Sequence, residues 1–269
     1  MLSIAGSDPS GGAGIQADIK AGQATGSFVA TAIVAVVDEN TVGVTGVHPI
    51  PVDFVRGQIK SVMEDLEPDA VKIGMLHSSE LILAVRDSLL KYKARNIVID
   101  PVMVATSGDA LLLPEAIATM REELLPLADV ITPNLPEGSL LLGREIGHNL
   151  EDMEAAAAEL GRRTNTSVYL KAGHIDEDDK GITMLTDILY DATTGQCHFY
   201  SAPRIHTRNT HGTGCTLSSA IASYLAQGYG LEEACRRGKQ YLAGAIGAGA
   251  AYSIGHGHGP VNHFYNLRK

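Results

Sequence analysis

The chain has 269 residues, and 21 lysines and arginines against 31 aspartates and glutamates leave a formal net charge of −10. This acidic balance argues against a protein that binds a nucleic-acid backbone, which normally presents a basic face. The apolar stretches are too short to span a bilayer, and three cysteines without C-x-x-C spacing favour a reducing compartment. We therefore expect a cytoplasmic protein that binds neither nucleic acid nor a membrane.

Apolar, β-branched runs alternate with segments of helical period along the chain. Strands are predicted over 31–37, 70–73, 96–100, 130–132 and 167–171, and helices over about 14–25, 53–66, 79–93, 114–126 and 150–163. A hairpin of strands 182–190 and 196–201 follows, and then helices over 214–227 and 231–250. This alternation favours a mostly parallel sheet covered on both faces, and we expect one α/β domain over residues 1–269.

Polar or glycine residues directly follow six of the apolar runs. In open parallel sheets, ligands bind beyond the carboxyl ends of the strands, so these segments are expected to form a ligand cleft. The six segments are 6–8, 38–40, 74–77, 100–103, 133–137 and 171–174.

The first glycine-rich loop, Gly11–Gly14, opens the first predicted helix. Its glycines allow the backbone to approach a ligand at a helix N-terminus. Residues 12–17 fit the dinucleotide pattern G-x-G-x-x-A, and Asp38 and Glu39 lie about 20 residues later, where that pattern places its ribose-binding acid. Alternatively, the loop only requires an unusual backbone conformation. A P-loop is excluded because Gln240 follows the only Gly-Lys pair, where the hydroxyl residue should be.

The second glycine-rich loop, Asn209–Thr216, leads into the helix predicted over 214–227. The Gly212-Thr213-Gly214 sequence would present consecutive backbone N–H groups to phosphate oxygens or to developing negative charge. Cys215 follows in the first helical turn, where the helix dipole favours a thiolate that could accept a proton from a substrate hydroxyl. The alternative is a small buried residue in a helix cap.

Two carboxylates, Asp100 and Glu137, follow predicted strands, as do Asn134 and Lys171. Carboxylates near polyphosphate are typical of a Mg²⁺ site, because this ion is held by one or two protein carboxylates. Alternatively, Asn134 caps a helix and Glu137 stabilises its first turn. Lys171 could meet a phosphate or pair with an acid.

The chain ends in a histidine-rich and glycine-rich segment with His256, His258 and His263. Two histidines in H-x-H spacing can bind a metal, but no third ligand of clear spacing follows them except His263. A turn that the glycines permit is the preferred interpretation. His174 and His211 are expected nearer to the chemistry.

Taken in order, several motifs closely resemble those of the hydroxymethylpyrimidine/phosphomethylpyrimidine kinases, in the ribokinase-like superfamily. The motifs are IAGSDPSGGAGIQAD over 4–18, KIGML over 72–76, DPVM over 100–103, ITPNLPE over 131–137, NTHGTGCT over 209–216 and GPV over 259–261. The resemblance implies a three-layer fold, with a mostly parallel sheet flanked by helices. It also implies ATP- and Mg²⁺-dependent phosphorylation of the pyrimidine's hydroxymethyl group and then of the monophosphate.

The resemblance further implies roles for individual residues and a homodimer. Gly212, Thr213 and Gly214 would form the anion hole, and Cys215 would be the base. Asp100 and Glu137 would manage Mg²⁺ and phosphate, and Lys171 and Asn134 would help to hold the nucleotide. The pyrimidine would lie among Gly6, Ala13, Met75 and Val102. Glu39 stands where the family usually has a glutamine that contacts the aminopyrimidine edge, so this position is expected to affect substrate preference.

Three other functions remain open at this stage. A pyridoxal or pyridoxine kinase of the same fold would carry the same Gly-x-Gly-Cys loop. A dinucleotide-dependent oxidoreductase would use Gly12–Ala17 for its cofactor. A non-catalytic relative would bind the pyrimidine without releasing ADP.

Overall fold

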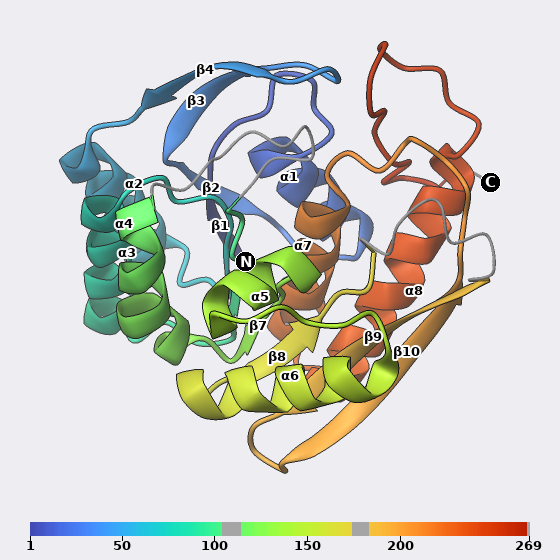
Figure 1. Ribbon diagram of the computed structural model, residues 1–269. Helices are drawn as coiled ribbons and strands as arrows, with labels where there is room; N and C mark the ends of the chain where they lie inside the picture. The colour runs from blue at the N-terminus through green and yellow to red at the C-terminus, as the bar shows by residue number, and fades with distance from the viewer. Residues whose placement is uncertain (104–113, 174–182, 268–269) are drawn as a thin grey trace.

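The computed structural model describes residues 1–103, 114–173 and 183–267, which form a central sheet with helices on both faces (Figure 1). Eight strands follow the order β10-β9-β8-β7-β6-β5-β1-β2. Six neighbouring strands of this sheet are parallel: β2, β1, β5, β6, β7 and β8. The last two, β9 and β10, form an antiparallel edge. The strands are β1 (Leu2–Ala5), β2 (Ala30–Ile33), β5 (Val71–Ile73), β6 (Ile97–Ile99), β7 (Val130–Ile131), β8 (Ser167–Leu170), β9 (Met184–Asp191) and β10 (Gln196–Pro203).

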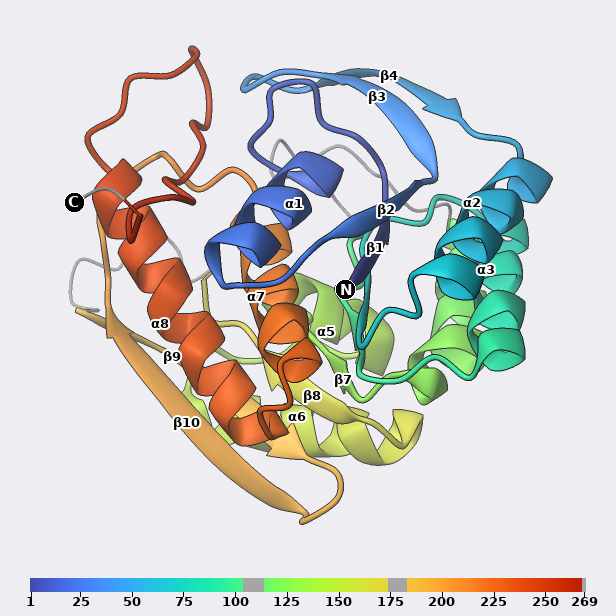
Figure 2. The same ribbon diagram turned by 180° about the vertical axis from the view of Figure 1, so that it is seen from behind.

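Helices cover both faces of this sheet, as the two opposite views show (Figure 1, Figure 2). On one face lie α1 (Gly14–Ala24), α7 (Thr213–Ala226) and α8 (Leu231–Gly249). On the other lie α2 (Val52–Asp65), α3 (Ser79–Tyr92), α4 (Pro114–Thr119), α5 (Leu135–Leu142) and α6 (Leu150–Thr164). The predicted α/β fold with a mostly parallel sheet between helical layers is confirmed. The helix expected over 114–126 continues beyond α4 as a π-helical turn (Met120–Leu124) and a 3₁₀ turn (Leu125–Leu127).

The continuous apolar runs of the parallel strands arise because both faces of the sheet are buried. In β6, Ile97 and Ile99 pack into the core on one side, whereas Val98 joins Leu217 and Ile221 of α7 on the other. Successive side chains of a strand point to opposite faces, so a strand between two helical layers needs apolar residues at every position.

The expected strand over 31–37 is divided between two sheets, which corrects the sequence prediction. β2 ends at Ile33, and β3 (Ala35–Glu39) pairs instead with β4 (Val44–Pro49) in a separate two-stranded sheet. The chain leaves the main sheet at Val34, whose N–H donates to Ala5 and whose carbonyl accepts from Ile50. Most of β4 is exposed, so it has no apolar run that could have predicted it.

The hairpin predicted over 182–190 and 196–201 is confirmed as β9 and β10, although Ile182, its expected first residue, lies outside the described residues.

Side chains at the starts of two helices cap their free backbone N–H groups. Ser78 accepts a hydrogen bond from the Leu81 N–H at the start of α3, and Asn149 does the same for Asp152 at the start of α6. Among the described helices, none has the length and apolar character needed to cross a bilayer.

Candidate active site

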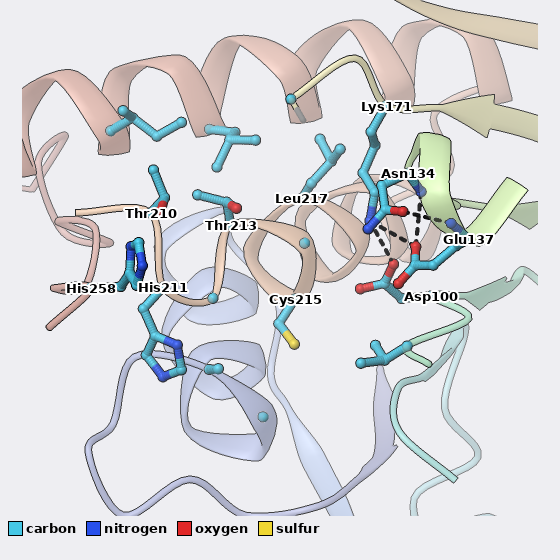
Figure 3. A pocket seen from close by; sticks show the side chains of 18 of the residues that line it. Asp100, Asn134, Glu137, Lys171, Thr210, His211, Thr213, Cys215, Leu217 and His258 are labelled. Atoms are coloured by element: carbon cyan, nitrogen blue, oxygen red, sulfur yellow. Dashed lines mark hydrogen bonds and ion pairs between the residues drawn. The ribbon is translucent and has the colours of Figure 1, made fainter. Parts of the chain in front are cut away.

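A cavity of about 660 Å³ lies at the carboxyl ends of the parallel strands (Figure 3). The ends of β1, β5, β6, β7 and β8 contribute to it, together with the end of β3 and the loop before α7. The expected cleft is therefore present. All candidate residues from the sequence line it: Gly6, Ala13, Glu39, Met75, Asp100, Val102, Asn134, Glu137, Lys171, Gly212, Thr213, Gly214 and Cys215.

The two glycine-rich loops pack directly against each other on one wall of the cavity. Gly212 has φ +78°, and a Cβ built on it would lie 1.8 Å from the Gly12 carbonyl oxygen. Gly14 has φ +52°, and its Cβ would lie 2.5 Å from the carbonyl oxygen of Gly6. Only glycine satisfies both the left-handed conformation and these close approaches. Eight residues separate Ala5, the end of β1, from Gly14, the start of α1, so the loop is not the tight strand-to-helix turn of a dinucleotide site.

A histidine–aspartate contact joins the same two loops. His211 Nε2 lies 2.9 Å from Asp8 Oδ2, which also accepts hydrogen bonds from the Gly12 and Ala13 amides at 3.0 and 2.6 Å. Burial disfavours the charged carboxylate, but these hydrogen bonds hold the pKa of Asp8 well below its ordinary value. Burial likewise opposes charge on His211, but Asp8 raises its pKa. The pair thus fixes the first loop against the second.

Asp8, His211 and Glu39 also place potential ligand atoms within 4.8 Å of one another. The Asp8 oxygens already accept protein hydrogen bonds, including two from Ser10. This arrangement favours a positioning role for Asp8 over metal binding.

The N-terminus of α7 faces the middle of the cavity, with Gly212 as its cap residue. The first amides of a helix have no acceptor within the helix, so they can bind an anion. A Cβ on Gly214 would lie 3.1 Å from Asp100 Oδ2 and 3.2 Å from Lys171 Nζ. Glycine at this position therefore brings the helix N-terminus close to the charged cluster.

Cys215 lies between this cluster and the first glycine-rich loop (Figure 3). The expectation that the helix dipole gives a thiolate is wrong for this structure. Burial raises the pKa of the Cys215 thiol to about 11, although Lys72 and a hydrogen bond from the Gly14 backbone act in the opposite direction. Asp18 and Asp100 raise the pKa further. The group is therefore a thiol at neutral pH in the absence of ligand.

Two carboxylates share one lysine at the other end of the cavity. Lys171 Nζ donates to Asp100 Oδ1 at 2.9 Å and lies 4.0 Å from Glu137 Oε2. Thr132 also donates to Asp100 Oδ1, at 2.9 Å. Burial raises the pKa of Glu137 to about 7, with Lys171 lowering it and Asp100 raising it. With both carboxylates ionised the cluster carries an excess of negative charge, and its carboxylate oxygens are donors that fit a divalent cation.

The capping alternative for Asn134 and Glu137 is also confirmed. The Asn134 side chain accepts from the Glu137 N–H, and Glu137 Oε2 accepts from the Asn134 N–H, both at 2.8 Å. This reciprocal capping box starts α5 and holds the Glu137 carboxylate toward the cavity. The structural and the functional interpretations of this pair are therefore compatible.

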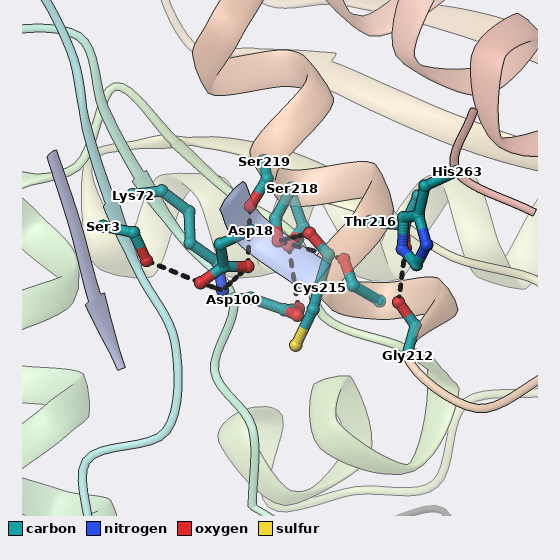
Figure 4. Close-up of polar contacts among 12 residues, drawn as sticks. Ser3, Asp18, Lys72, Asp100, Gly212, Cys215, Thr216, Ser218, Ser219 and His263 are labelled. Atoms are coloured by element: carbon teal, nitrogen blue, oxygen red, sulfur yellow. Dashed lines mark hydrogen bonds and ion pairs between the residues drawn. The ribbon is translucent and has the colours of Figure 1, made fainter. Parts of the chain in front are cut away.

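A second charged group lies beneath the cavity and is completely buried (Figure 4). Lys72 Nζ donates to both Asp18 oxygens, at 2.8 and 2.9 Å. Ser3 and Ser219 donate to the same carboxylate at 2.5 and 2.7 Å. Burial opposes the charge on Lys72, but Asp18 more than offsets this and raises the pKa of the lysine. The hydrogen bonds of this pair connect β1, α1, β5 and α7.

Sequence reasoning missed Lys239 and Asp187, which line the cavity near the edge strands. Lys239 Nζ donates to Asp187 Oδ2 at 2.7 Å. Lys239 belongs to the Gly-Lys pair that does not fit a P-loop, and its spacing to Asp187 carries no motif. Leu217, Leu242 and Ile246 add an apolar wall in the same region. Leu217 lies on α7, and Leu242 and Ile246 lie on α8, which only the fold places at the cavity.

The tail histidines do not converge on a metal site in the described part of the chain, where Asp8, Glu39 and His211 are the only such group. His263 is buried, and its Nε2 lies 3.0 Å from Thr216 Oγ1. Burial lowers the pKa of His263 to about 4. Gly255 has φ +74°, as the preferred turn requires. His174 lies outside the described residues.

Comparison with known proteins agrees with this geometry. The phosphomethylpyrimidine kinase family matches residues 8–262. The chain is 48% identical over 268 residues to the hydroxymethylpyrimidine/phosphomethylpyrimidine kinase of Rhizobium meliloti (strain 1021), covering 100% of this chain and 98% of that protein.

Solved structures of related kinases share the fold of this chain. An ADP complex of Bacillus subtilis pyridoxal kinase has a TM-score of 0.89 and 34% identity, covering 100% of this chain and 98% of the other. A phosphomethylpyrimidine kinase from Clostridium difficile 630 has a TM-score of 0.78 and 42% identity, with 91% and 98% covered. These similarities set aside the oxidoreductase and the non-catalytic binding protein. The chain belongs to the phosphomethylpyrimidine kinase family and has its ribokinase-like fold.

Proposed function

We propose that the chain transfers the γ-phosphoryl group of ATP to the hydroxymethyl group of 4-amino-5-hydroxymethyl-2-methylpyrimidine and then to the resulting monophosphate. The product is the pyrimidine diphosphate used in thiamine biosynthesis. The observation that carries this proposal is one continuous cavity in which the N-terminus of α7 lies between a small-molecule end and a charged end. Phosphoryl transfer depends mainly on positioning and charge stabilisation, which this arrangement supplies.

The pyrimidine would occupy the small-molecule end, among Gly6, Ala13, Met75 and Val102. Gly6 is in close contact with Met75, since a Cβ on Gly6 would lie 2.7 Å from the Met75 methyl group. The absence of a side chain at Gly6 therefore lets Met75 approach the backbone at this end of the cavity. Glu39 at the end of β3 would accept a hydrogen bond from the ring amino group.

ATP would occupy the charged end. Lys171 would hold its phosphates, with Asn134 and Asp100 nearby, and the apolar wall of α7 and α8 suits a nucleotide base. Asp100 and Glu137 would hold Mg²⁺, which neutralises phosphate charge when it is bound. The N–H groups from Gly212 to Gly214 would stabilise negative charge on the transferred group.

Cys215 would accept the proton of the substrate hydroxyl. We expect Cys215→Ala to lower kcat by a factor of roughly 10²–10⁴, as for a lost general base. Because the pKa of the thiol is about 11, kcat of the unaltered protein should rise with pH above neutrality. Cys197→Ala is the matched control, since this half-buried thiol does not line the cavity. Near-normal turnover by folded Cys215→Ala would leave Cys215 as a packing residue.

An ADP-release assay tests the reaction, with hydroxymethylpyrimidine, its monophosphate, pyridoxal and pyridoxine compared with and without Mg²⁺. Activity on both pyrimidines that depends on Mg²⁺ supports the proposal. Preference for pyridoxal would favour the second candidate, a pyridoxal kinase, which the similarity to the Bacillus subtilis pyridoxal kinase brings into consideration. A single domain, a homodimer and a cytoplasmic location remain predictions that gel filtration, proteolysis and cell fractionation can test.

A further inference from the structure

The glycine-rich segment near the C-terminus forms a loop, residues 255–259, that lies against the tip of the β3–β4 hairpin. In both views the hairpin tip and this loop lie side by side, over α1 and α8 (Figure 1, Figure 2). The contact point is Thr41, in the turn between β3 and β4. His256 and Gly257 donate their backbone N–H groups to Thr41 Oγ1, both at 3.2 Å. His258 donates its N–H to the Thr41 carbonyl oxygen at 2.8 Å.

Steric space explains why this loop is built from glycines. A Cβ on Gly255 would lie 2.2 Å from Thr41 Oγ1, and one on Gly257 would lie 1.9 Å from the Thr41 carbonyl oxygen. Carbon and oxygen cannot approach so closely, so any side chain at Gly257 must push the hairpin tip away. The glycines therefore serve a close approach between backbones.

The other end of the loop is attached to the anion-hole segment. A Cβ on Gly259 would lie 2.1 Å from Asn209 Oδ1, and the His211 N–H donates to the Gly259 carbonyl at 3.1 Å. Asn209 Nδ2 in turn donates to the carbonyl oxygens of Gly249 and Tyr252, both at 2.8 Å. The loop thus connects the hairpin tip to the segment that precedes α7.

The inner strand of the hairpin is anchored in the core, where Ala35 and Val37 are buried. Its base is held by Ser7, whose N–H donates to the Ala35 carbonyl and whose hydroxyl accepts from the Val37 N–H. Most side chains of β4 are exposed, so hydrophobic burial does little to hold the outer strand. Glu39 lies two residues before Thr41 and lines the cavity, as does His258.

We propose that loop 255–259 is a clamp that holds the hairpin tip, with Thr41 and Gly257 as positioning residues for Glu39 at the small-molecule end of the cavity. This inference rests on the proposed function for its kinetic consequences. The clamp itself is a property of the protein without ligand. Its expected signature is weaker binding of the pyrimidine, with binding of ATP at the charged end unchanged.

Thr41→Val tests the clamp because it removes the hydroxyl acceptor and preserves the volume of the side chain. Thr45→Val is the matched control, since the Thr45 hydroxyl donates at 3.1 Å to the Asp38 carbonyl within the same hairpin and does not contact the loop. We expect Thr41→Val to raise KM for the pyrimidine roughly threefold to tenfold, as for one or two lost hydrogen bonds. The kcat value and KM for ATP should change less, and Thr45→Val should behave like the unaltered protein.

Gly257→Ala is the stronger disruption and should raise the same KM more than Thr41→Val does. Gly57→Ala is its control, because nothing lies within 4 Å of a Cβ at Gly57. Equal changes in kcat and in both KM values would indicate general damage and overturn the positioning role.

Hydrogen exchange of the hairpin amides provides a readout that does not depend on activity. Exchange between residues 36 and 48 should become faster in Thr41→Val and Gly257→Ala, and should stay unchanged in the two controls. Unchanged exchange in both clamp variants would overturn the clamp. Faster exchange with an unaltered KM would overturn the positioning of Glu39. If the unaltered protein does not phosphorylate the pyrimidine, the proposed function fails, and the exchange measurement still decides whether the clamp exists.

Discussion

Two lysines in this protein, Lys72 and Lys171, each face carboxylates, but their surroundings differ. Lys72 and Asp18 have side chains that are 0% exposed, and both oxygens of Asp18 accept hydrogen bonds from the lysine and from serines. Lys171 is 14% exposed and faces two carboxylates, Asp100 and Glu137, at the wall of the cavity. The first group is balanced in charge and closed to ligands. The second has an excess of negative charge and an open side.

This difference separates a group that stabilises the fold from one that can bind a ligand. A buried ion pair with all its hydrogen bonds satisfied gains nothing from another charge. A cluster with one lysine and two carboxylates has an excess of negative charge that a cation can offset. Burial, with a further contribution from Asp100, raises the pKa of Glu137 to about 7. Cys215 lies between the two groups, since Lys72, Asp18 and Asp100 all affect its pKa.

The largest expected effect is on stability, from breaking the closed pair. Lys72→Met leaves Asp18 as a buried charge without its partner, and we expect a loss of about 3–5 kcal/mol in the free energy of unfolding. Urea unfolding measures this loss. Ser219→Ala is the control, because it removes one hydrogen bond from the same carboxylate and should cost about 1 kcal/mol. A cost for Lys72→Met no larger than that of the control would contradict the view of Lys72 and Asp18 as a stabilising pair.

Lys171→Met should affect activity more than stability. We expect kcat/KM to fall roughly 10²–10³-fold, as for a removed donor to a developing anion. The protein can compensate for the lost charge because Glu137 can take up a proton and Asp100 keeps its hydrogen bond from Thr132. Steady-state kinetics and urea unfolding on the same preparation provide the comparison. If Lys171→Met turns over normally but unfolds as readily as Lys72→Met, then Lys171 stabilises the fold and does not act in the reaction.

A smaller effect concerns the pH dependence of stability without ligand. The pKa of Glu137 is about 7 in the folded protein and 4.5 as its ordinary value, so the folded state binds the proton more tightly. Its contribution to stability is therefore present below pH 4.5 and is lost as pH rises through 7. Glu137→Gln should flatten this part of the profile and preserve the cap of α5, since the amide oxygen can still accept from Asn134. An identical profile for both proteins, followed by urea unfolding from pH 4 to 8, would rule out a raised pKa at Glu137.

Much of the candidate site could be predicted from local sequence. The residues at the ends of β1, β5, β6, β7 and β8 were identifiable because a ligand cleft forms where parallel strands end. The glycines of 11–14 and 212–214 marked the positions of close backbone approach. Asn134 and Glu137 carried a capping pattern that the structure confirms.

Other features depend on partners that are distant in the sequence. Lys72 looked like one polar residue in an apolar strand, because Asp18 lies 54 residues away. The division of 31–37 into β2 and β3 depends on two hydrogen bonds of Val34. Its N–H donates to the Ala5 carbonyl, and its carbonyl accepts from the Ile50 N–H. The glycines of 255–259 indicated only a turn, and their contact with Thr41 depends on the fold.

The sequence by itself determined the alternation of strands and helices, the glycine-rich loops and the family to which the chain is similar. These features follow from periodicity and from short motifs, which are local. Only the tertiary structure decided the direction of the pKa shift at Cys215, the difference between Lys72 and Lys171, and the contact of the C-terminal loop with the hairpin. Burial and electrostatic interactions depend on distances in space, and residues far apart along the chain set those distances when it folds.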